Sequence, residues 1–289
     1  SFECGFVLEM MESCEFILYI YMVFHTPFYL NMLLVCWDVL GGLNVCTFKY
    51  FVIWVLATRM SGEMCTSLGN GWANFCLCDF VAKKSGVLYK GRFEGDDGVV
   101  AILGGEMDVS LFARLGMKID LQKVSDLSEA SFCGLIFDPT ELNIITNPIK
   151  VLANFAWGKG RYRAARQAVL LQLLKAKALS FMHQYPACPI VSELARYALR
   201  MTRNITIRKS IIDQLDSFER GRLLDAMACP DLDANKPIGM GTRCLMERVF
   251  GVGVEIQLQI EELFRVKQDL EPISIPQIDW PEGLVDYAE

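Results

Sequence analysis

Three carboxylates crowd into one short polar segment of the chain. Glu94, Asp96 and Asp97 lie in "YKGRFEGDDGVVAIL", residues 89–103, between glycines and two apolar runs. Like charges this close repel one another, and holding them together is costly unless a positive group neutralises them. A bound cation would do so, which makes the segment a candidate for metal chemistry. The alternative is an acidic turn that only faces solvent.

The flanking sequence predicts a β-hairpin that would position these acids. "VLYKGRF" and "GVVAIL" are short runs rich in β-branched and aromatic residues, and the polar segment between them is bounded by glycines. This pattern is typical of two strands joined by a tight reversal. The acidic side chains would then project from the turn.

A second pattern precedes the acidic turn. Ser61, Gly62, Thr66 and Asn70 form S-G-x-x-x-T-x-x-x-N. Thr66 and Asn70 are four residues apart and would share one face of a helix, after a mobile loop formed by the Ser-Gly pair. An Asn amide offers both a donor and an acceptor, which suits a ribose hydroxyl. The alternative is a glycine hinge followed by an Asn with no function.

Together and in this order, the two patterns resemble motifs B and C of the palm domain of viral RNA-dependent RNA polymerases. "RMSGEMCTSLGN" is similar to motif B of tombusvirus-like and noda-like positive-strand RNA viruses, and "FEGDDG" to their motif C. The resemblance implies that Asp96 binds catalytic Mg²⁺ (or Mn²⁺) and that Asp97 assists. It also implies a nucleotide-binding role for the residues of the second pattern, which are Ser61, Gly62, Thr66 and Asn70. Glu94 departs from many relatives and receives no role.

The first residues extend the resemblance. "SFE" is similar to the end of motif A, which makes Glu3 its second acid and the partner of Asn70 in ribose recognition. The first motif A Asp would lie before Ser1. We therefore expect the chain to be a piece of a longer polymerase, with the fingers upstream.

Two later segments resemble motifs D and E. "LGMKIDLQKV" is similar to motif D, in which a lysine is the proposed general acid, and the spacing after Gly116 favours Lys123 over Lys118. A solvated lysine is the alternative. "SFCGLIFDPTELNIIT" predicts a second hairpin with a D-P-T-E turn. Its first part, "SFCGLIF", residues 131–137, is similar to the motif E hairpin.

Composition narrows the classes of function. The chain has 289 residues, 53% of them hydrophobic, which is enough for one large domain or two smaller ones. A net charge of −6 excludes a basic nucleic-acid coat, so RNA contacts must come from local basic patches. His25 and His183 are far apart and leave little material for a His-based catalytic centre. The 11 cysteines include no C-x-x-C pair, so we expect reduced thiols rather than a zinc site or disulfides.

A long apolar segment is the strongest rival signal. Residues 16–37, "FILYIYMVFHTPFYLNMLLVCW", carry no charged residue over a length that could span a bilayer. His25, Pro27 and Asn31 within it oppose a membrane span, as does the absence of a Lys or Arg cluster at either end. We expect a buried helix–turn–helix broken near Pro27. A membrane-anchored scaffold of a replication complex is the alternative.

The expected fold class is α+β. Residues 1–148 would form a polymerase palm, an antiparallel sheet flanked by helices, with part of the fingers insertion. Residues 149–270 would form a mainly helical thumb, and 271–289 an extended acidic tail. Helical periodicity is predicted in "YRAARQAVLLQLLKAKALSFM", "IVSELARYALRMT" and "IRKSIIDQLDSFERGRLLDAM".

A basic cluster is expected at the start of the first thumb helix. It consists of Lys159, Arg161, Arg163 and Arg166. In an acidic protein such a cluster suggests contacts with RNA phosphates. A solvated helix face is the alternative.

The sequence therefore predicts an RNA-dependent RNA polymerase fragment, inactive by itself because the first motif A Asp is missing. Its partners would be the RNA template and nascent strand, nucleoside triphosphates and other viral replicase subunits, at membrane-associated replication complexes in the host cytoplasm. Reverse transcriptase is a third hypothesis. It is weaker because that family usually carries Y-x-D-D and lacks the S-G-x-x-x-T-x-x-x-N helix.

Overall fold

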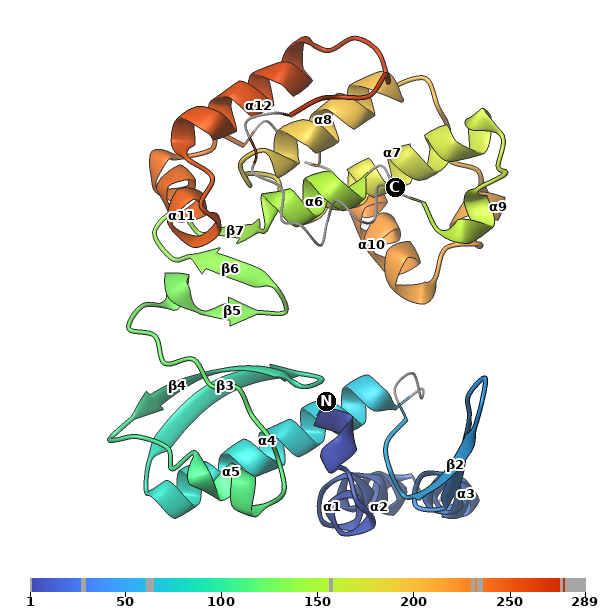
Figure 1. Ribbon diagram of the computed structural model, residues 1–289, viewed down its shortest axis with the longest axis vertical. Coiled ribbons are helices and arrows are strands. Elements are labelled where there is room, and N and C mark those ends of the chain that lie inside the picture. Colours follow the sequence, from blue (N-terminus) through green and yellow to red (C-terminus); the bar gives the residue numbers. More distant parts are fainter. Residues whose placement is uncertain are drawn as a thin grey trace. The chain divides into compact units, whose positions relative to one another are not determined.

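The chain folds into two compact units, Ser1–Lys123 and Val124–Glu289. The structure, a computed structural model (Figure 1), describes residues 2–26, 30–60, 65–155, 158–229, 232, 236–275 and 278. Each unit has its own hydrophobic core and its own small antiparallel sheets among helices. This confirms the α+β class.

The first unit contains helices and two separate hairpins. It opens with short helical turns, η1 (Phe2–Gly5), α1 (Leu8–Met10) and η2 (Met11–Glu15). Then follow α2 (Phe16–His25), α3 (Leu30–Leu40), β1 (Leu43–Thr47), β2 (Val52–Leu56), α4 (Thr66–Ser85), β3 (Leu88–Glu94), β4 (Asp97–Leu103) and α5 (Ser110–Arg114).

Helix α4 is the centre of the first unit. Ala73, Leu77 and Val81 are buried at a spacing of four residues, so they form one face that packs into the core. The helix ends where Gly86 adopts a left-handed conformation with φ 69°, and Lys83 and Lys84 lie in its last turn. A left-handed glycine and cations at this end both stabilise a helix terminus.

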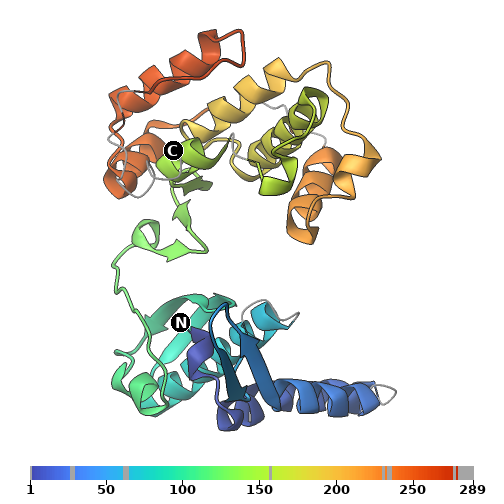
Figure 2. The ribbon, with the colours of Figure 1, turned by 45° about the vertical axis from the view of Figure 1, so that its right-hand side comes forward.

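The apolar segment 16–37 forms parts of two helices, α2 and α3, which contact each other (Figure 2). Pro27 lies outside the described residues. Among the residues that the structure describes, no helix is long and apolar enough to cross a membrane. The prediction that this segment is buried is wrong: only Phe16 of α2 and Leu40 of α3 are buried. These residues lie at one end of each helix, and only those ends reach the core.

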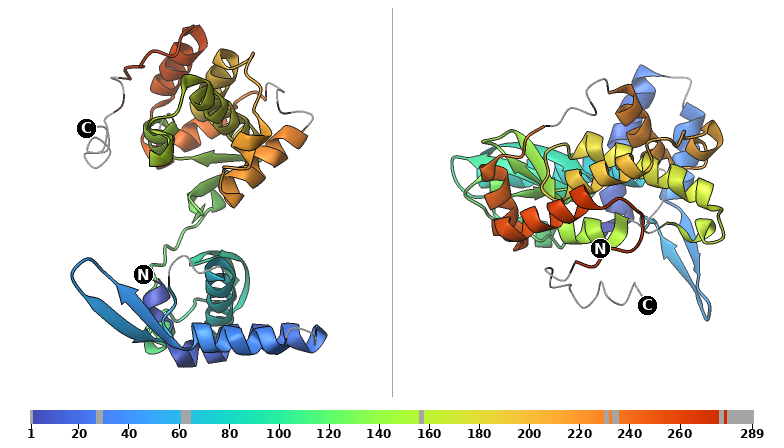
Figure 3. Two further views of the ribbon diagram at one scale, coloured as in Figure 1. Left: turned by 90° about the vertical axis from the view of Figure 1, so that its right-hand side faces the viewer. Right: turned by 90° about the horizontal axis from the view of Figure 1, so that it is seen from above.

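The β1–β2 hairpin was not predicted. Its strands pair from Leu43↔Leu56 to Thr47↔Val52, and its tip reaches away from the rest of the first unit (Figure 3). Trp54 is 63% exposed and Tyr50 is 84% exposed. Together with the outer sides of α2 and α3, the hairpin gives the first unit an extensive exposed apolar surface.

The predicted hairpin around the acidic segment is confirmed. Strands β3 and β4 pair in antiparallel register from Leu88↔Leu103 to Glu94↔Asp97. This register leaves Gly95 and Asp96 as a two-residue turn. Gly95 has φ 56°, the conformation that a type II′ turn requires at its first central position and that glycine adopts without strain.

The second unit combines a three-stranded sheet with helices. The sheet has the order β5 (Ser131–Phe132), β6 (Leu135–Asp138), β7 (Asn143–Thr146), preceded by η4 (Leu127–Glu129). After it come α6 (Pro148–Phe155), η5 (Gly160–Tyr162), α7 (Gln167–Gln184), α8 (Val191–Met201), α9 (Lys209–Ile212), α10 (Ser217–Ala228), α11 (Met240–Phe250) and α12 (Val254–Val266).

The sheet of the second unit packs with the helices that follow it. Ile136 and Ile145 share a core with Val191 and Met246. At the tip of the predicted hairpin, Asp138 accepts hydrogen bonds from the backbone of Thr140 and Glu141 (3.0 and 3.1 Å). The two units divide after Lys123, whereas the expected boundary between palm and thumb is at residue 148.

Three details of the helical region differ from the expectation. The basic cluster precedes α7, which begins only at Gln167, because Arg166 has an extended backbone (ψ 148°). The third predicted helix is broken into α9 and α10, since Asp216 caps α10. Of the expected tail, residues 271–275 lie outside helices and strands and Ile278 packs into the core; residues 276–277 and 279–289 are outside the described residues.

Candidate functional site

One face of α4 lies against the acidic turn. Asn74 Nδ2 donates hydrogen bonds to the backbone oxygens of Asp96 (3.1 Å) and Asp97 (3.2 Å). A Cβ placed on Gly71 would lie 3.3 Å from the backbone nitrogen of Gly95. The helix that carries the second pattern is thus in direct contact with the acidic turn, through Asn74 and Gly71, which lie just after that pattern.

The first turn of α4 also reaches this hairpin. Ser67 Oγ donates to Glu94 Oε1 at 2.6 Å. Thr66, at the start of the helix, donates its hydroxyl to the backbone oxygen of Met60 (3.3 Å). Ser61 and Gly62, the loop residues of the same pattern, lie outside the described residues.

Asn70 contacts the residue with which the resemblance pairs it. Asn70 Nδ2 donates to Glu3 Oε1 at 3.2 Å, joining α4 to η1. Asn70 is 2% exposed. Its Oδ1 accepts no hydrogen bond within the described part of the chain. A buried acceptor without a donor costs about 1–3 kcal/mol, and a hydroxyl group of a ligand would satisfy it.

The carboxylates of the turn face solvent. Glu94, Asp96 and Asp97 are all exposed. Across residues 2–26, 30–60 and 65–123 no lysine or arginine pairs with Asp96 or Asp97. Within these residues the charge of Asp96 and Asp97 is therefore not neutralised by a cationic side chain.

The turn provides ligands of the type that Mg²⁺ prefers, since carboxylate oxygens are hard donors. Among the described residues, however, no group of three or more His, Cys, Asp or Glu side chains could hold a metal ion. Asp96 and Asp97 supply two carboxylates from one hairpin. This donor set fits the chemistry of magnesium but does not complete a two-ion site.

A buried ion pair packs against α4 at Gly69. Arg59 pairs with Glu15, and both side chains are 0% exposed. Tyr19 also donates its hydroxyl to Glu15. A Cβ on Gly69 would lie 2.6 Å from Arg59 Nη2 and 2.7 Å from Glu15 Oε1. Gly69 therefore allows α4 to approach the pair, which fixes Arg59 two residues before Ser61.

Asn74, Ser67 and the Glu15–Arg59 pair are not among the site residues predicted from the sequence. Asn74 had a signal: it follows Asn70 by four residues and so shares its helix face. The ion pair had none, because Glu15 and Arg59 are far apart in the chain and nothing local indicates that they meet.

Lys123, the predicted general acid, contacts a residue outside the acidic turn. Its Nζ pairs with Glu106 Oε2 at 2.8 Å, and both side chains are exposed. The hydrogen bond from Lys123 lowers the pKa of Glu106. The structure gives Lys123 no contact with the acidic turn.

The four residues of the basic cluster have different surroundings. Lys159 pairs with Asp216 and with Glu219 (3.1 Å), and the hydrogen bond to Asp216 raises the pKa of Lys159 most. Arg161 donates to the backbone oxygen of Gln214 at 2.7 Å. Arg163 and Arg166 are exposed and form no ion pair within the described residues. Lys159 is thus neutralised, while the three arginines keep their charge for a ligand.

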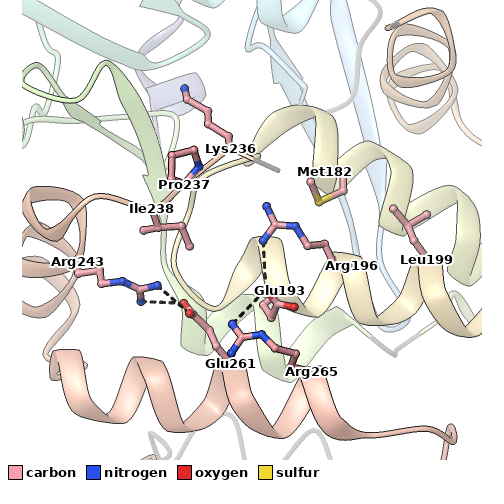
Figure 4. Close-up of a pocket in the computed structure, with 10 residues that line it drawn as sticks. All are labelled: Met182, Glu193, Arg196, Leu199, Lys236, Pro237, Ile238, Arg243, Glu261 and Arg265. Carbon is pink, nitrogen blue, oxygen red and sulfur yellow. Dashed lines mark hydrogen bonds and ion pairs between the residues drawn. The ribbon is translucent and has the colours of Figure 1, made fainter. Parts of the chain in front are cut away.

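A cavity of about 490 Å³ between α8, α11 and α12 is lined by two carboxylates that are paired with arginines (Figure 4). Arg243 makes two hydrogen bonds to Glu261, at 2.9 and 2.8 Å. Glu193 accepts from Arg196 at 3.2 Å and lies 3.7 Å from Arg265. Because each carboxylate has an arginine partner, these ion pairs stabilise the helices; Lys236, which also lines the cavity, forms no ion pair among the described residues.

A comparison with protein-family models, with curated proteins and with solved structures finds no match to this chain.

Proposed function

We propose that the chain is the palm and thumb part of a viral RNA-dependent RNA polymerase, which transfers nucleotides to a growing RNA strand under the direction of a template. The observation that carries this proposal is the contact between the helix of the second pattern and the acidic turn: α4 lies against the Asp96–Asp97 turn through Asn74. On the same helix, Asn70 bonds Glu3, as the resemblance to motifs A and B implies.

Each group of site residues would have the role that its chemistry suits. Asp96 and Asp97 would hold Mg²⁺ (or Mn²⁺), which supplies charge stabilisation for the attacking and leaving oxygens in nucleotidyl transfer. Asn70 and Glu3 would recognise the ribose 2′-hydroxyl, since the free Asn70 Oδ1 can accept a hydrogen bond from it. Ser61, Gly62 and Thr66 would complete the nucleotide site, and Lys123 would be the general acid.

In this proposal residues 1–148 correspond to the palm with part of the fingers, and residues 149–270 to the helical thumb. The RNA template, the nascent strand and nucleoside triphosphates would be its partners. The setting would be a membrane-associated replication complex with other replicase subunits in the host cytoplasm.

A membrane-associated scaffold is the second candidate. The exposed apolar side chains of α2, α3 and the β1–β2 hairpin favour it, because exposed apolar patches of this extent mark contacts with a partner or a lipid surface. Reverse transcription is a variant of the first candidate and differs in the sugar that is incorporated.

The test is incorporation of labelled ribonucleotides on a primed RNA template by the chain extended upstream along its own gene. We expect synthesis with the wild-type sequence and none with Asp96→Asn, while circular dichroism shows the same fold. Synthesis that persists in Asp96→Asn would contradict the proposal. Equal use of deoxynucleotides would favour reverse transcription, and co-flotation with lipid vesicles without synthesis would favour the scaffold.

A further inference from the structure

In the helical unit α9 lies beside α7 (Figure 1). A second cavity is lined by residues of these two helices and of the segment before α7. Its volume is about 550 Å³, within the range of small-molecule sites, ~300–1,000 Å³. The polar residues that line it are Arg161, Tyr162, Gln172, Arg208, Ser210 and Gln214.

The lining carries positive charge that no acid neutralises. Two arginines line the cavity, and none of its lining residues is acidic. The guanidinium of Arg208 forms no ion pair or hydrogen bond in the described part of the second unit. Arg161 makes one hydrogen bond, to the backbone oxygen of Gln214. This distinguishes the cavity from the one near α8, where each carboxylate pairs with an arginine.

The wall holds these groups in place. The Arg161 guanidinium lies 4.8 Å from the centre of the Tyr162 ring, a cation–π arrangement that limits its motion. Gln172, 5% exposed, accepts a hydrogen bond from the backbone nitrogen of Arg208 at 2.9 Å. A site whose groups are already ordered loses less entropy when a ligand binds.

One polar atom of the cavity lacks a partner. The Tyr162 hydroxyl oxygen is buried and forms no hydrogen bond among the residues that the structure describes. A phenol hydroxyl can donate to an anionic oxygen. Two arginines and a tyrosine whose hydroxyl has no partner thus line the same cavity.

We propose that this cavity binds the phosphate groups of a nucleotide. The planar guanidinium fork pairs with phosphate oxygens through two parallel hydrogen bonds, and the Tyr162 hydroxyl offers a further donor. The phosphates come from a free nucleoside triphosphate or from an RNA strand, and the exposed Arg163 and Arg166 lie in the same segment of the chain. The inference rests on the proposed function only in choosing nucleotides as the source of phosphate.

The experiment measures binding to the 289-residue chain by calorimetry, in EDTA so that the acidic turn holds no metal. The probes are sodium tripolyphosphate, ATP and a short single-stranded RNA. In Arg161→Gln/Arg208→Gln we expect at least about tenfold weaker binding, the value of one lost charge-assisted hydrogen bond. Tyr162→Phe, which keeps the ring, should weaken binding by a smaller factor.

The matched control is Arg114→Gln/Lys150→Gln, which removes the same charge from two exposed residues outside the cavity. Thermal unfolding shows whether each variant is folded. Binding of tripolyphosphate and ATP that only the cavity variant loses identifies a free nucleotide as the ligand, and the same loss for RNA alone identifies the strand. Equal weakening in the control, or no binding of any probe to the wild-type chain, would overturn the inference.

These probes need no polymerisation, so the result is independent of the proposed activity. Asp96→Asn should bind all three probes as the wild-type chain does. A chain that binds phosphate in the cavity but never synthesises RNA would keep this inference and remove the polymerase assignment.

Discussion

Two glycines inside helices differ in the space that a side chain at their position would have. Gly69 in α4 faces the buried Glu15–Arg59 pair, whereas a Cβ on Gly221 in α10 would contact nothing within 4 Å. Alanine favours a helix over glycine by roughly 0.5–1 kcal/mol. That gain is available only where the new methyl group has room.

We predict opposite effects of the two alanine substitutions on unfolding. Gly69→Ala should destabilise the first unit by about 2–4 kcal/mol, because the methyl group would overlap Arg59 and Glu15 and disturb a buried ion pair. Gly221→Ala should stabilise the second unit by about 0.5–1 kcal/mol. Thermal and urea unfolding measure both. A Gly69→Ala protein as stable as the wild type would show that α4 does not lie this close to the pair.

Only part of the site could be predicted residue by residue. The spacing of Thr66 and Asn70 places them on one helix face, and the resemblance to motif A paired Asn70 with Glu3, which the structure brings to 3.2 Å. The pairing of Glu15 with Arg59 could not be predicted, because it depends on how α4 packs over η2. Lys159 had the expected charge, but its carboxylate partners lie 57 and 60 residues away.

At the scale of elements, one side chain of α4 holds the acidic turn. Asn74 donates to two consecutive backbone oxygens of that turn, and Gly71 lets the helix approach it. Asn74 touches no carboxylate, so its role is to position the turn that carries them.

We predict that Asn74→Ala loosens the turn without unfolding the unit. Loss of two hydrogen bonds should cost about 1–2 kcal/mol and raise the amide exchange rate of the β3–β4 hairpin near Gly98. Hydrogen exchange measured by NMR tests this. Ser67→Ala is the control, since it removes a single exposed hydrogen bond to Glu94 and should change exchange at the turn less. Unchanged exchange in Asn74→Ala would assign the positioning to Gly71 alone.

The break between α9 and α10 depends on Asp216. Its Oδ1 accepts from the backbone nitrogen of Glu219 at 2.7 Å and caps α10. That hydrogen bond, followed by the one from Lys159, lowers the pKa of Asp216 from 3.8 to about 2. A depressed pKa in the folded state means that the carboxylate stabilises the fold above its ordinary pKa, and that this contribution is lost as the pH falls towards 2.

Two substitutions separate the cap from the charge. Asp216→Asn keeps the acceptor but not the charge, so we expect a smaller loss of stability between pH 4 and pH 2 than in the wild type. Asp216→Ala removes the cap and should cost about 1 kcal/mol at neutral pH. Urea unfolding across this pH range measures both. Identical pH profiles for the wild type and Asp216→Asn would show that other carboxylates set the acid response.

Elements with local signals were predicted, and those without were not. The β3–β4 and β6–β7 hairpins have alternating strands and a polar turn, so the sequence places them correctly. The β1–β2 hairpin was missed because its strands belong to a nearly continuous apolar stretch. The start of α7 was placed too early because Arg and Ala favour helices, although the chain at Arg166 is extended.

For the whole molecule, the division into two units depends on packing that the sequence does not display. The β5–β7 sheet follows the first unit without a glycine- or proline-rich linker, so composition gave no reason to separate them. Its apolar residues Ile136 and Ile145 enter a core formed with α8 and α11. The two units divide after Lys123, within residues 120–127, which are all exposed.

The whole chain is expected to lack a complete site for two metal ions. Two-metal catalysis needs carboxylates from more than one strand, and magnesium binds weakly to one or two carboxylates without substrate phosphates. In the part of the chain that the structure describes, only Asp96 and Asp97 project from the turn, and no third acid joins them. We therefore expect the 289-residue chain to extend no primer at physiological magnesium, even with template and triphosphates present.

Primer extension by the chain alone, beside the chain extended upstream along its gene, tests this prediction. Synthesis by the longer protein only would agree with a carboxylate supplied from upstream. If the 289-residue chain alone extends a primer, an acid within it must complete the site, and the assignment of Glu3 to motif A is wrong. Glu15 is not that acid, because it is buried in its pair with Arg59. Glu9 and Glu12 are exposed, so loss of the activity in Glu9→Gln or Glu12→Gln would identify the missing ligand.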